Sequence, residues 1–266
     1  MYAKYSCPKG HNKVKEKKAW SNRFWPRLFW LQAKQIILQE SLISTHIPVA
    51  TYCYLRKIIK LMGTDIPEFW EHAFKEKKEM WGFEPSNSAI QTKEFFLQNS
   101  IRNILIPGIG YGRNAQVFKD SGITVTGIEI SETAINMAKK HFGSDTIIYH
   151  GSVTDMPFDK CKYEGIFCHG LIYLLAYNER EKVIQDCFNQ LTENGYMIFT
   201  VISKQASTYG QGKLISNDRY EMFGGVSIFF YDHESIETEF GNFGLFEISE
   251  VSENYPFFLI KCRKAD

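Results

Sequence analysis

The chain has 266 residues, of which 44% are hydrophobic and 15% aromatic, enough for one sizeable core with an appendage. Its six cysteines are scattered without a CxxC pair, which argues against a disulfide framework or a zinc site and favours a reducing, cytoplasmic compartment. No segment reaches the roughly 18 apolar residues of a membrane span. We therefore expect a cytoplasmic protein with no metal and no membrane span.

The net charge of +1 conceals two segments of opposite sign. Residues 1–61 hold 12 basic and two acidic side chains, a charge of +10, and three of the five tryptophans. Residues 62–266 hold 19 basic and 28 acidic side chains, a charge of −9. Because segments of such different chemistry rarely share one folded unit, we expect residues 1–61 to be a basic N-terminal extension outside the fold and Met62 to open the folded domain. A nucleic-acid or membrane-surface contact is the alternative role for the extension.

Beyond Met62 the apolar pattern is that of an α/β protein. Helical periodicity begins near Asp65, and a second short helix follows at about 89–98. Apolar runs predict strands at about 103–107, 124–129, 145–150, 163–168 and 195–202, separated by helices at about 112–121, 131–142 and 178–192. This alternation predicts parallel strands joined by right-handed crossovers, with ligands at their carboxyl ends.

The pattern changes after residue 203. A long polar stretch occupies Lys204–Gly225. It is followed by an apolar run at 227–231, a helix near 233–240, and two further apolar runs at 246–251 and 257–262. We expect the last strand to insert antiparallel. The predicted fold class is therefore a Rossmann-like, doubly wound α/β fold with a mostly parallel seven-stranded sheet and an antiparallel last strand.

The most informative segment is Ile104–Asn114, which reads ILIPGIGYGRN. It is a buried strand that runs straight into a glycine-rich turn, in which Gly108 and Gly110 let the backbone approach a ligand. The next strand ends in Glu129, whose carboxylate can accept hydrogen bonds from both hydroxyls of a ribose. This arrangement predicts one side of a site for an adenosine-type cofactor.

The glycine spacing helps to decide which cofactor this is. Dinucleotide sites use GxGxxG/A, whereas the glycines here are Gly108, Gly110 and Gly112, and Arg113 takes the final position. A cation is disfavoured at a helix N-terminus, so Arg113 is expected to have an anionic partner, either a ligand carboxylate or a nearby acid. The spacing favours a ligand with a free carboxylate, and an NAD(P)-dependent oxidoreductase remains the alternative.

Three further segments follow in a recognisable order: Gly151–Phe158 (GSVTDMPF), Tyr163–Leu174 (YEGIFCHGLIYL) and Leu191–Ile198 (LTENGYMI). With the glycine turn, they resemble the class I S-adenosylmethionine-dependent methyltransferases over about residues 100–202. The resemblance implies S-adenosyl-L-methionine as the cofactor and methyl transfer as the reaction. It also implies that Ser152 and Val153 flank the adenine, although Ser152 replaces the usual Asp.

The form PGIG at Pro107–Gly110, together with Trp70 and Trp81, is similar to a narrower branch that contains the thiopurine, halide/thiol and tellurite-resistance methyltransferases. In that branch a tryptophan-bearing N-terminal helix covers the cofactor, and a Cys or other small residue stands where this chain has Ile109. The likeness implies a small-molecule methyl acceptor and a monomer or homodimer.

The motifs and the resemblance together give a set of predicted site residues. His169 lies where the family places residues near cofactor and acceptor, and acts either as a general base or as a structural histidine. Cys168 is expected to be an inert thiol, and Tyr173, Tyr209 and Tyr220 are candidates for the acceptor pocket, Tyr173 also for catalysis. The predicted cofactor-binding residues are Trp81, Gly108, Ile109, Gly110, Arg113, Glu129, Ile130, Ser152, Val153, Cys168 and His169.

We do not expect nucleic acid to be the substrate. The sequence CHGL at residues 168–171 lacks the Asn/Asp-Pro-Pro-aromatic motif of amino-directed DNA methyltransferases. A domain with a charge of −9 also repels phosphates, unless residues 1–61 deliver the substrate. An RNA-targeted enzyme and a non-catalytic protein of methyltransferase fold therefore remain as alternatives to a small-molecule enzyme.

Overall fold

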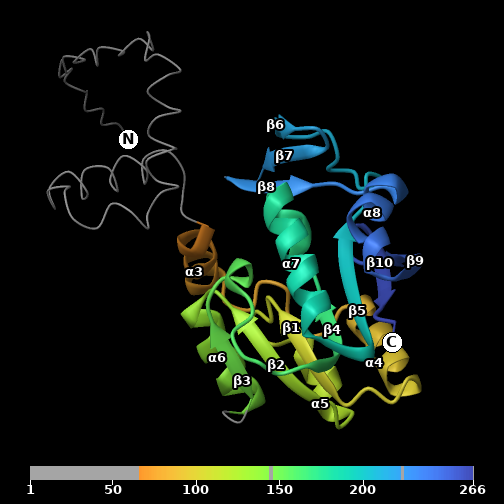
Figure 1. Ribbon diagram of the computed structural model, residues 1–266. Helices are drawn as coiled ribbons and strands as arrows, with labels where there is room; N and C mark the ends of the chain where they lie inside the picture. The colour runs from red at the N-terminus through yellow and green to blue at the C-terminus, as the bar shows by residue number, and fades with distance from the viewer. Residues whose placement is uncertain (1–65, 144–145, 223–224, 266) are drawn as a thin grey trace, which may run out of the picture. The chain divides into compact units, whose positions relative to one another are not determined.

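The computed structural model describes residues 66–143, 146–222 and 225–265. The basic segment 1–61 and the expected boundary at Met62 lie outside these ranges and stay predictions. The described chain opens with helices α3 (Ile66–Lys77) and α4 (Asn87–Gln98) (Figure 1). Ser86 caps α4, because its side chain accepts a hydrogen bond from the backbone N–H of Ala89. In the ranges that the structure describes, none of the helices is long and apolar enough to cross a membrane.

A seven-stranded sheet forms the centre of the domain, in the order β3-β2-β1-β4-β5-β10-β9. Strands β1 to β5 pair in parallel, and β10 lies antiparallel between β5 and β9. The predicted fold class, including the antiparallel last strand, is confirmed. The strands are β1 (Asn103–Pro107), β2 (Thr124–Glu129), β3 (Ile147–His150), β4 (Tyr163–Cys168), β5 (Leu191–Ile202), β9 (Leu245–Ser252) and β10 (Pro256–Arg263).

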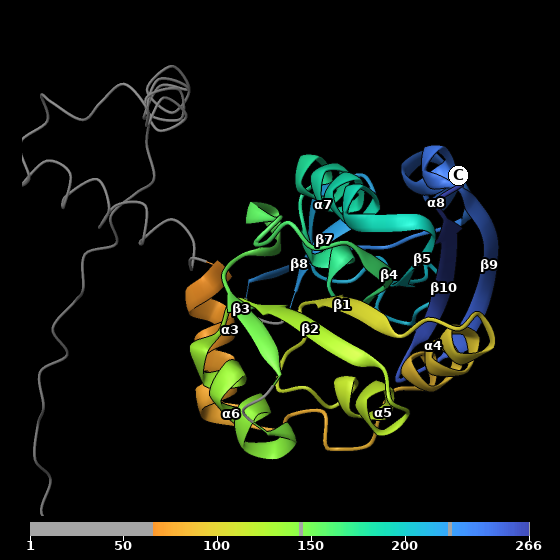
Figure 2. The same cartoon turned by 60° about the horizontal axis from the view of Figure 1, so that its bottom comes forward.

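Helices cover both faces of this sheet. The remaining helices are α5 (Ala115–Asp120), α6 (Glu132–Phe142), α7 (Tyr177–Gln190) and α8 (His233–Phe240). Helices α4, α5 and α6 lie on one face, and α7 and α8 lie on the other (Figure 2). Along β1, Ile104 belongs to a core with Phe118 of α5, whereas Leu105 belongs to a core with Val183 of α7. Burial on both faces explains why the strands read as continuous apolar runs.

The polar stretch Lys204–Gly225 holds two strands that were not predicted from the sequence. It contains strands β6 (Lys213–Ser216) and β7 (Arg219–Met222), which pair with β8 (Val226–Phe229) in a separate three-stranded antiparallel sheet. All four residues of β6 are exposed and those of β7 are only half-buried. Short strands without a buried face lack the alternating apolar pattern by which strands are identified from sequence.

Candidate functional site

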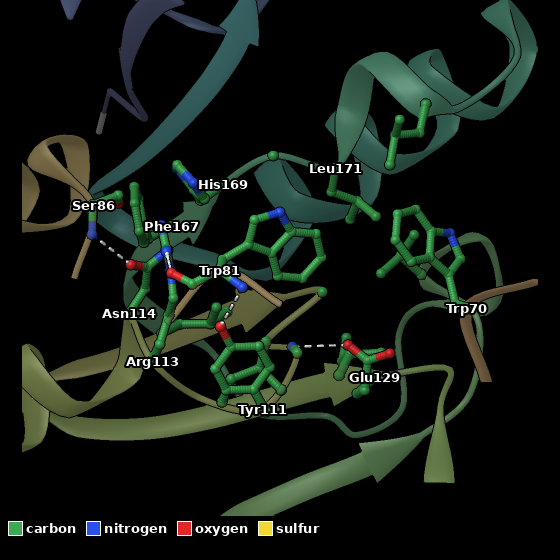
Figure 3. A pocket seen from close by; sticks show the side chains of 18 of the residues that line it. Trp70, Trp81, Ser86, Tyr111, Arg113, Asn114, Glu129, Phe167, His169 and Leu171 are labelled. Atoms are coloured by element: carbon green, nitrogen blue, oxygen red, sulfur yellow. Dashed lines mark hydrogen bonds between the residues drawn. The ribbon is translucent and has the colours of Figure 1, made fainter. Parts of the chain in front are cut away.

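A cavity of about 600 Å³ opens at the carboxyl ends of β1, β2 and β4, the edge at which ligands bind in sheets of this type. Its volume lies within the range of small-molecule sites. The wall comes from α3 and the loop that follows it, the glycine turn, the loops after β2, β3 and β4, and the turn between β9 and β10. Figure 3 shows part of this wall.

The glycine turn folds back over the end of β2. The backbone N–H groups of Gly108 and Ile109 both donate to the carbonyl oxygen of Ile128, at 2.9 and 3.1 Å. Gly108 and Gly110 have φ of +69° and +58°, a conformation that side chains disfavour. A Cβ at Gly110 would meet nothing closer than Phe74 Cζ at 3.9 Å. At Gly110 the turn therefore presents bare backbone to the cavity, whereas at Gly108 a Cβ would meet the Leu171 side chain at 3.1 Å.

Glu129 lies beside this turn and is only 5% exposed. Its Oε2 accepts from the N–H of Gly110 at 2.8 Å, and its Oε1 accepts from the N–H groups of Ile130 and Ser131, both at 3.0 Å. Burial raises the pKa of the Glu129 carboxyl, and these three N–H donors act in the opposite direction. A carboxylate has about four lone-pair directions, so the arrangement leaves room for one more hydrogen bond from a ligand hydroxyl. A second one requires one of the three N–H groups to release its carboxylate oxygen.

The loop after β3 supplies the next part of the wall. Ser152 and Val153 both line the cavity. The Ser152 Oγ accepts from the N–H of Thr154 at 3.2 Å and lies 2.7 Å from the Thr154 Oγ1. The serine hydroxyl is thus engaged within its own turn, and Val153, which is 7% exposed, provides an apolar surface.

Four aromatic side chains form one side of the cavity: Trp70 and Phe74 from α3, Trp81 from the loop after it, and Tyr111 from the glycine turn. The rings of Trp81 and Tyr111 are almost parallel, with centroids 6.2 Å apart and 10° between their planes. Phe74 meets Trp81 edge to face at 5.9 Å. Trp81 itself is 45% exposed, so it lies at the rim of the cavity.

Glu71 fastens α3 to the rest of the domain. Its Oε2 accepts from the Ser131 Oγ at 2.7 Å and from the Thr133 N–H at 3.1 Å, and its Oε1 accepts from the Thr133 Oγ1 at 2.7 Å. Burial raises the pKa of Glu71, but the hydrogen bonds from Ser131 and Thr133 outweigh burial and bring the pKa down to about 2. The N–H of Ser131 also donates to Glu129. Ser131 therefore links α3, which carries Trp70 and Phe74 of the aromatic cover (Trp70, Phe74, Trp81 and Tyr111), to the buried Glu129 carboxylate.

Arg113 lies in the turn before α5 and lines the cavity. Its Nη1 donates to the carbonyl oxygen of Trp81 at 2.6 Å, which ties the glycine turn to the loop after α3. Within the described ranges, no acidic side chain forms an ion pair with Arg113. A guanidinium has five N–H donors, so several remain for an anionic ligand group.

His169, just beyond the end of β4, lines the cavity with its ring fixed. Its Nδ1 lies 3.0 Å from the Ser88 Oγ and 3.1 Å from the Thr200 Oγ1. Burial lowers the pKa of His169 to about 4, against the opposite influence of the Glu253 carboxylate. The imidazole is therefore neutral near neutral pH.

Four other candidates differ in their surroundings. Tyr173 lines the cavity, and burial raises the pKa of its phenol. Cys168 lies instead in the core on the α7 side, where burial raises the pKa of its thiol to about 12. Tyr209 and Tyr220 pack against Phe230 and are absent from the cavity wall.

Part of the wall carried no signal in the sequence. Glu253 and Tyr255, from the turn between β9 and β10, and Phe257, at the start of β10, line the cavity beside the start of α4. Leu174 and Leu175 also line it, and the guanidinium of Arg219 on β7 donates to both of their carbonyl oxygens. Only Leu174 belongs to a segment singled out in the sequence, because the fold alone brings Arg219 and the residues near β10 to the site. In the described part of the chain, no group of three or more His, Cys, Asp or Glu side chains is placed to hold a metal ion.

Comparison with known proteins identifies the domain. Residues 105–199 match the family model for a methyltransferase domain. A protein of Geobacillus sp. (strain WCH70), whose name assigns it provisionally to the methyltransferases, is 27% identical over 165 residues. The match covers 60% of this chain and 61% of that protein, so the chain spans less than two thirds of the length of this relative.

Solved structures share the fold of this domain. The 1,6-didemethyltoxoflavin-N1-methyltransferase of Burkholderia thailandensis, with bound 1,6-didemethyltoxoflavin and S-adenosylhomocysteine, superposes with a TM-score of 0.61 at 13% identity, covering 76% of this chain and 88% of its own. The magnesium protoporphyrin IX methyltransferase of Synechocystis PCC 6803, with bound S-adenosylmethionine, gives 0.56 at 11% identity, covering 76% and 99%. At these identities the likeness concerns the fold alone.

Proposed function

We propose that this chain, which carries a class I S-adenosylmethionine-dependent methyltransferase domain, transfers a methyl group from that cofactor to a small-molecule acceptor. One observation carries the proposal. Bare glycine backbone and the buried Glu129 carboxylate border a cavity of about 600 Å³ at the carboxyl edge of the parallel strands. This combination suits an adenosine-type ligand.

The residues present fit the cofactor group by group. Glu129 accepts a hydrogen bond from a ribose hydroxyl, and Val153, with Ile130, gives the adenine an apolar surface. The backbone of Gly110 leaves room for the amino-acid part, whose carboxylate can accept hydrogen bonds from the remaining donors of Arg113. These roles are assignments that rest on the lining of the cavity.

When bound, S-adenosylmethionine supplies a methyl group activated by a positively charged sulfur. The chain itself contributes position and the exclusion of water. Trp70, Phe74 and Trp81 cover one side of the cavity, and the fixed loops after β2 and β4 border it.

A small acceptor is supported by the size of the cavity and by its surroundings. The domain beyond residue 61 carries a charge of −9, which opposes binding of a nucleic acid. The Burkholderia enzyme of similar fold holds a small heterocyclic compound. Both features favour a small organic molecule over a macromolecule.

Isothermal titration calorimetry of the full chain tests the cofactor. S-adenosylhomocysteine, which is S-adenosylmethionine without the methyl group, and NAD are titrated separately under the same conditions. We expect saturable binding of S-adenosylhomocysteine and no measurable binding of NAD. Tight binding of NAD with none of S-adenosylhomocysteine would point to an oxidoreductase and overturn the proposal.

A further inference from the structure

We propose that the part of the cavity formed by His169, Tyr173, Phe257 and Glu253 binds a flat aromatic acceptor, and that His169 takes a proton from the O–H or N–H group that is methylated. This inference rests on the proposed function, because it names the acceptor class for the same site. All four residues line the cavity, and they come from the loop after β4 and from the β9–β10 turn and its following strand.

His169 is held so that one ring nitrogen is left for a ligand. The Ser88 and Thr200 hydroxyls lie 3.0 and 3.1 Å from Nδ1, and Thr200 is itself fixed by accepting from the Gly170 N–H at 3.0 Å. Among the described residues, no hydrogen-bond partner lies at Nε2. The two ring nitrogens point in divergent directions, and with the proton of the neutral ring on Nδ1, donated to one of these hydroxyls, Nε2 is the nitrogen that can accept a proton.

The charge on this side of the cavity favours that role. A histidine that burial keeps neutral, with a pKa of about 4, has a free lone pair near neutral pH. The Glu253 carboxylate, which acts on this pKa in the opposite direction, stabilises the imidazolium that forms when the proton arrives. It is fixed by the N–H of Ser88 on Oε1 at 2.8 Å and by the N–H of Asn87 on Oε2 at 3.2 Å. Ser88 thus contacts both His169 and Glu253.

Aromatic rings lie beside the imidazole of His169. The rings of His169 and Phe257 are nearly parallel, with 13° between their planes and centroids 6.4 Å apart. Tyr173 meets Phe257 edge to face at 5.8 Å. Within the described ranges the Tyr173 hydroxyl has no hydrogen-bond partner, and because burial raises its pKa it stays a phenol that can donate. Flat surfaces with one donor and one acceptor suit an aromatic ring that bears an ionisable O–H or N–H.

The charges around the cavity disfavour an anionic acceptor. Arg113 is the one Lys or Arg among the described lining residues, and its Nη1 is already bonded to the carbonyl oxygen of Trp81. Three carboxylates, those of Glu84, Glu129 and Glu253, line the same space. An acceptor that carries a carboxylate or phosphate would be repelled by Glu253, the one of these three carboxylates that acts on the pKa of His169.

The proton and electron balance is simple. A lone pair on the acceptor oxygen or nitrogen forms the new bond to the methyl carbon, and the electron pair of the broken carbon–sulfur bond stays on sulfur. The proton of the acceptor passes to the Nε2 of His169, which later releases it to solvent. A thiol is acidic and nucleophilic enough to need little help from such a base, and that difference makes the proposal testable.

The test measures transfer of the tritiated methyl group from S-adenosylmethionine to three probes: 7-hydroxycoumarin, 4-hydroxyquinoline and thiophenol. The full chain is compared with His169→Asn, which retains a side-chain partner for Ser88 and Thr200 but lacks Nε2. We expect transfer to the two hydroxylated heterocycles, reduced by about 100-fold in the variant, and any transfer to thiophenol unchanged. His72→Asn, at an exposed position on α3, is the matched control.

Tyr173→Phe removes only the hydroxyl and is expected to raise the KM for the heterocycles about fivefold with little change in kcat. Tyr177→Phe, which alters an exposed tyrosine of α7, controls for it. Binding of S-adenosylhomocysteine to every variant is measured in parallel. If no protein binds it, the proposed function fails. If it binds but neither heterocycle is methylated, or if His169→Asn leaves their methylation unchanged, this inference fails and the proposed function stands.

Discussion

The two ends of the cavity differ in how the chain supplies them. The end assigned to the cofactor comes mainly from one stretch, residues 104–153, in which each strand delivers its loop to the same edge of the sheet, together with aromatic side chains from α3 and the loop after it. The end assigned to the acceptor is assembled from the start of α4, the loop after β4 and the β9–β10 turn. A cofactor common to a family can be held by a local motif, whereas an acceptor that varies between enzymes is met by residues from distant segments.

The difference predicts that substitutions at the two ends separate cofactor binding from acceptor use. The largest effect is expected from Glu129→Ala. Loss of a charge-assisted hydrogen bond to the ribose, together with three backbone N–H groups left without their acceptor, should weaken S-adenosylhomocysteine binding by about 100-fold. Calorimetry measures it, and Glu132→Ala, an exposed acid in the first turn of α6, should bind normally. If folded Glu129→Ala kept its affinity for S-adenosylhomocysteine, this carboxylate would not belong to the cofactor site.

Gly110→Ala sharpens the assignment of the glycine turn. The substitution forces a side chain into a backbone with φ of +58° and directs a methyl group into the cavity. We expect about tenfold weaker S-adenosylhomocysteine binding and a loss of about 1 kcal/mol in the free energy of unfolding. Gly122→Ala has the same kind of strain, with φ of +76° and open space around it, and should lose stability alone. Equal cofactor affinity in the two variants would contradict the account.

At the acceptor end, Arg219→Ala should leave cofactor binding intact. The guanidinium ties β7 to the carbonyl oxygens of Leu174 and Leu175, which line the cavity. Without it, we expect kcat/KM for a hydroxylated heterocycle to fall about fivefold as this wall loosens. Lys213→Ala, on the exposed strand β6 of the same small sheet, is the control. A change in S-adenosylhomocysteine affinity larger than that in kcat/KM would show that the two ends are not separate.

The smallest effect is expected at Glu71, which joins α3 to Ser131 and Thr133. Glu71→Gln should weaken S-adenosylhomocysteine binding by about threefold, because the aromatic cover is held less firmly. Glu76→Gln, whose side chain is 60% exposed on the same helix, should not.

Glu71 also gives a pH dependence with a definite sign. Its pKa is lowered from 4.5 to about 2, so the stability that it contributes is present above pH 4.5 and is lost as the pH falls toward 2. With 26% of the side chain exposed, we expect this contribution to be about 1 kcal/mol. Chemical unfolding at pH 7 and at pH 2 should therefore show wild type and Glu71→Gln converging at the lower pH. A constant difference between them would assign the effect to another cause.

Residues close together in the sequence were predictable, and those that depend on distant pairing were not. Gly108 and Glu129 follow directly after buried strands, so their place at the sheet edge follows from the parallel order alone. Phe257 reaches the cavity only because β10 inserts antiparallel between β5 and β9. Ser88 contributes only because α4 begins beside the β9–β10 turn, where Glu253 accepts from its N–H. Cys168 belongs to the core on the α7 side of the sheet, although its neighbour His169 lines the cavity.

The measurement that tests the account most directly is a crystal structure of the full chain with S-adenosylhomocysteine bound. The account predicts a ribose hydroxyl on the Glu129 carboxylate and the cofactor sulfur directed toward His169, Tyr173 and Phe257, with open space between the sulfur and the Nε2 of His169. A ribose held elsewhere, or a sulfur directed toward Trp81 and Tyr111, would contradict the division of the cavity into a cofactor end and an acceptor end.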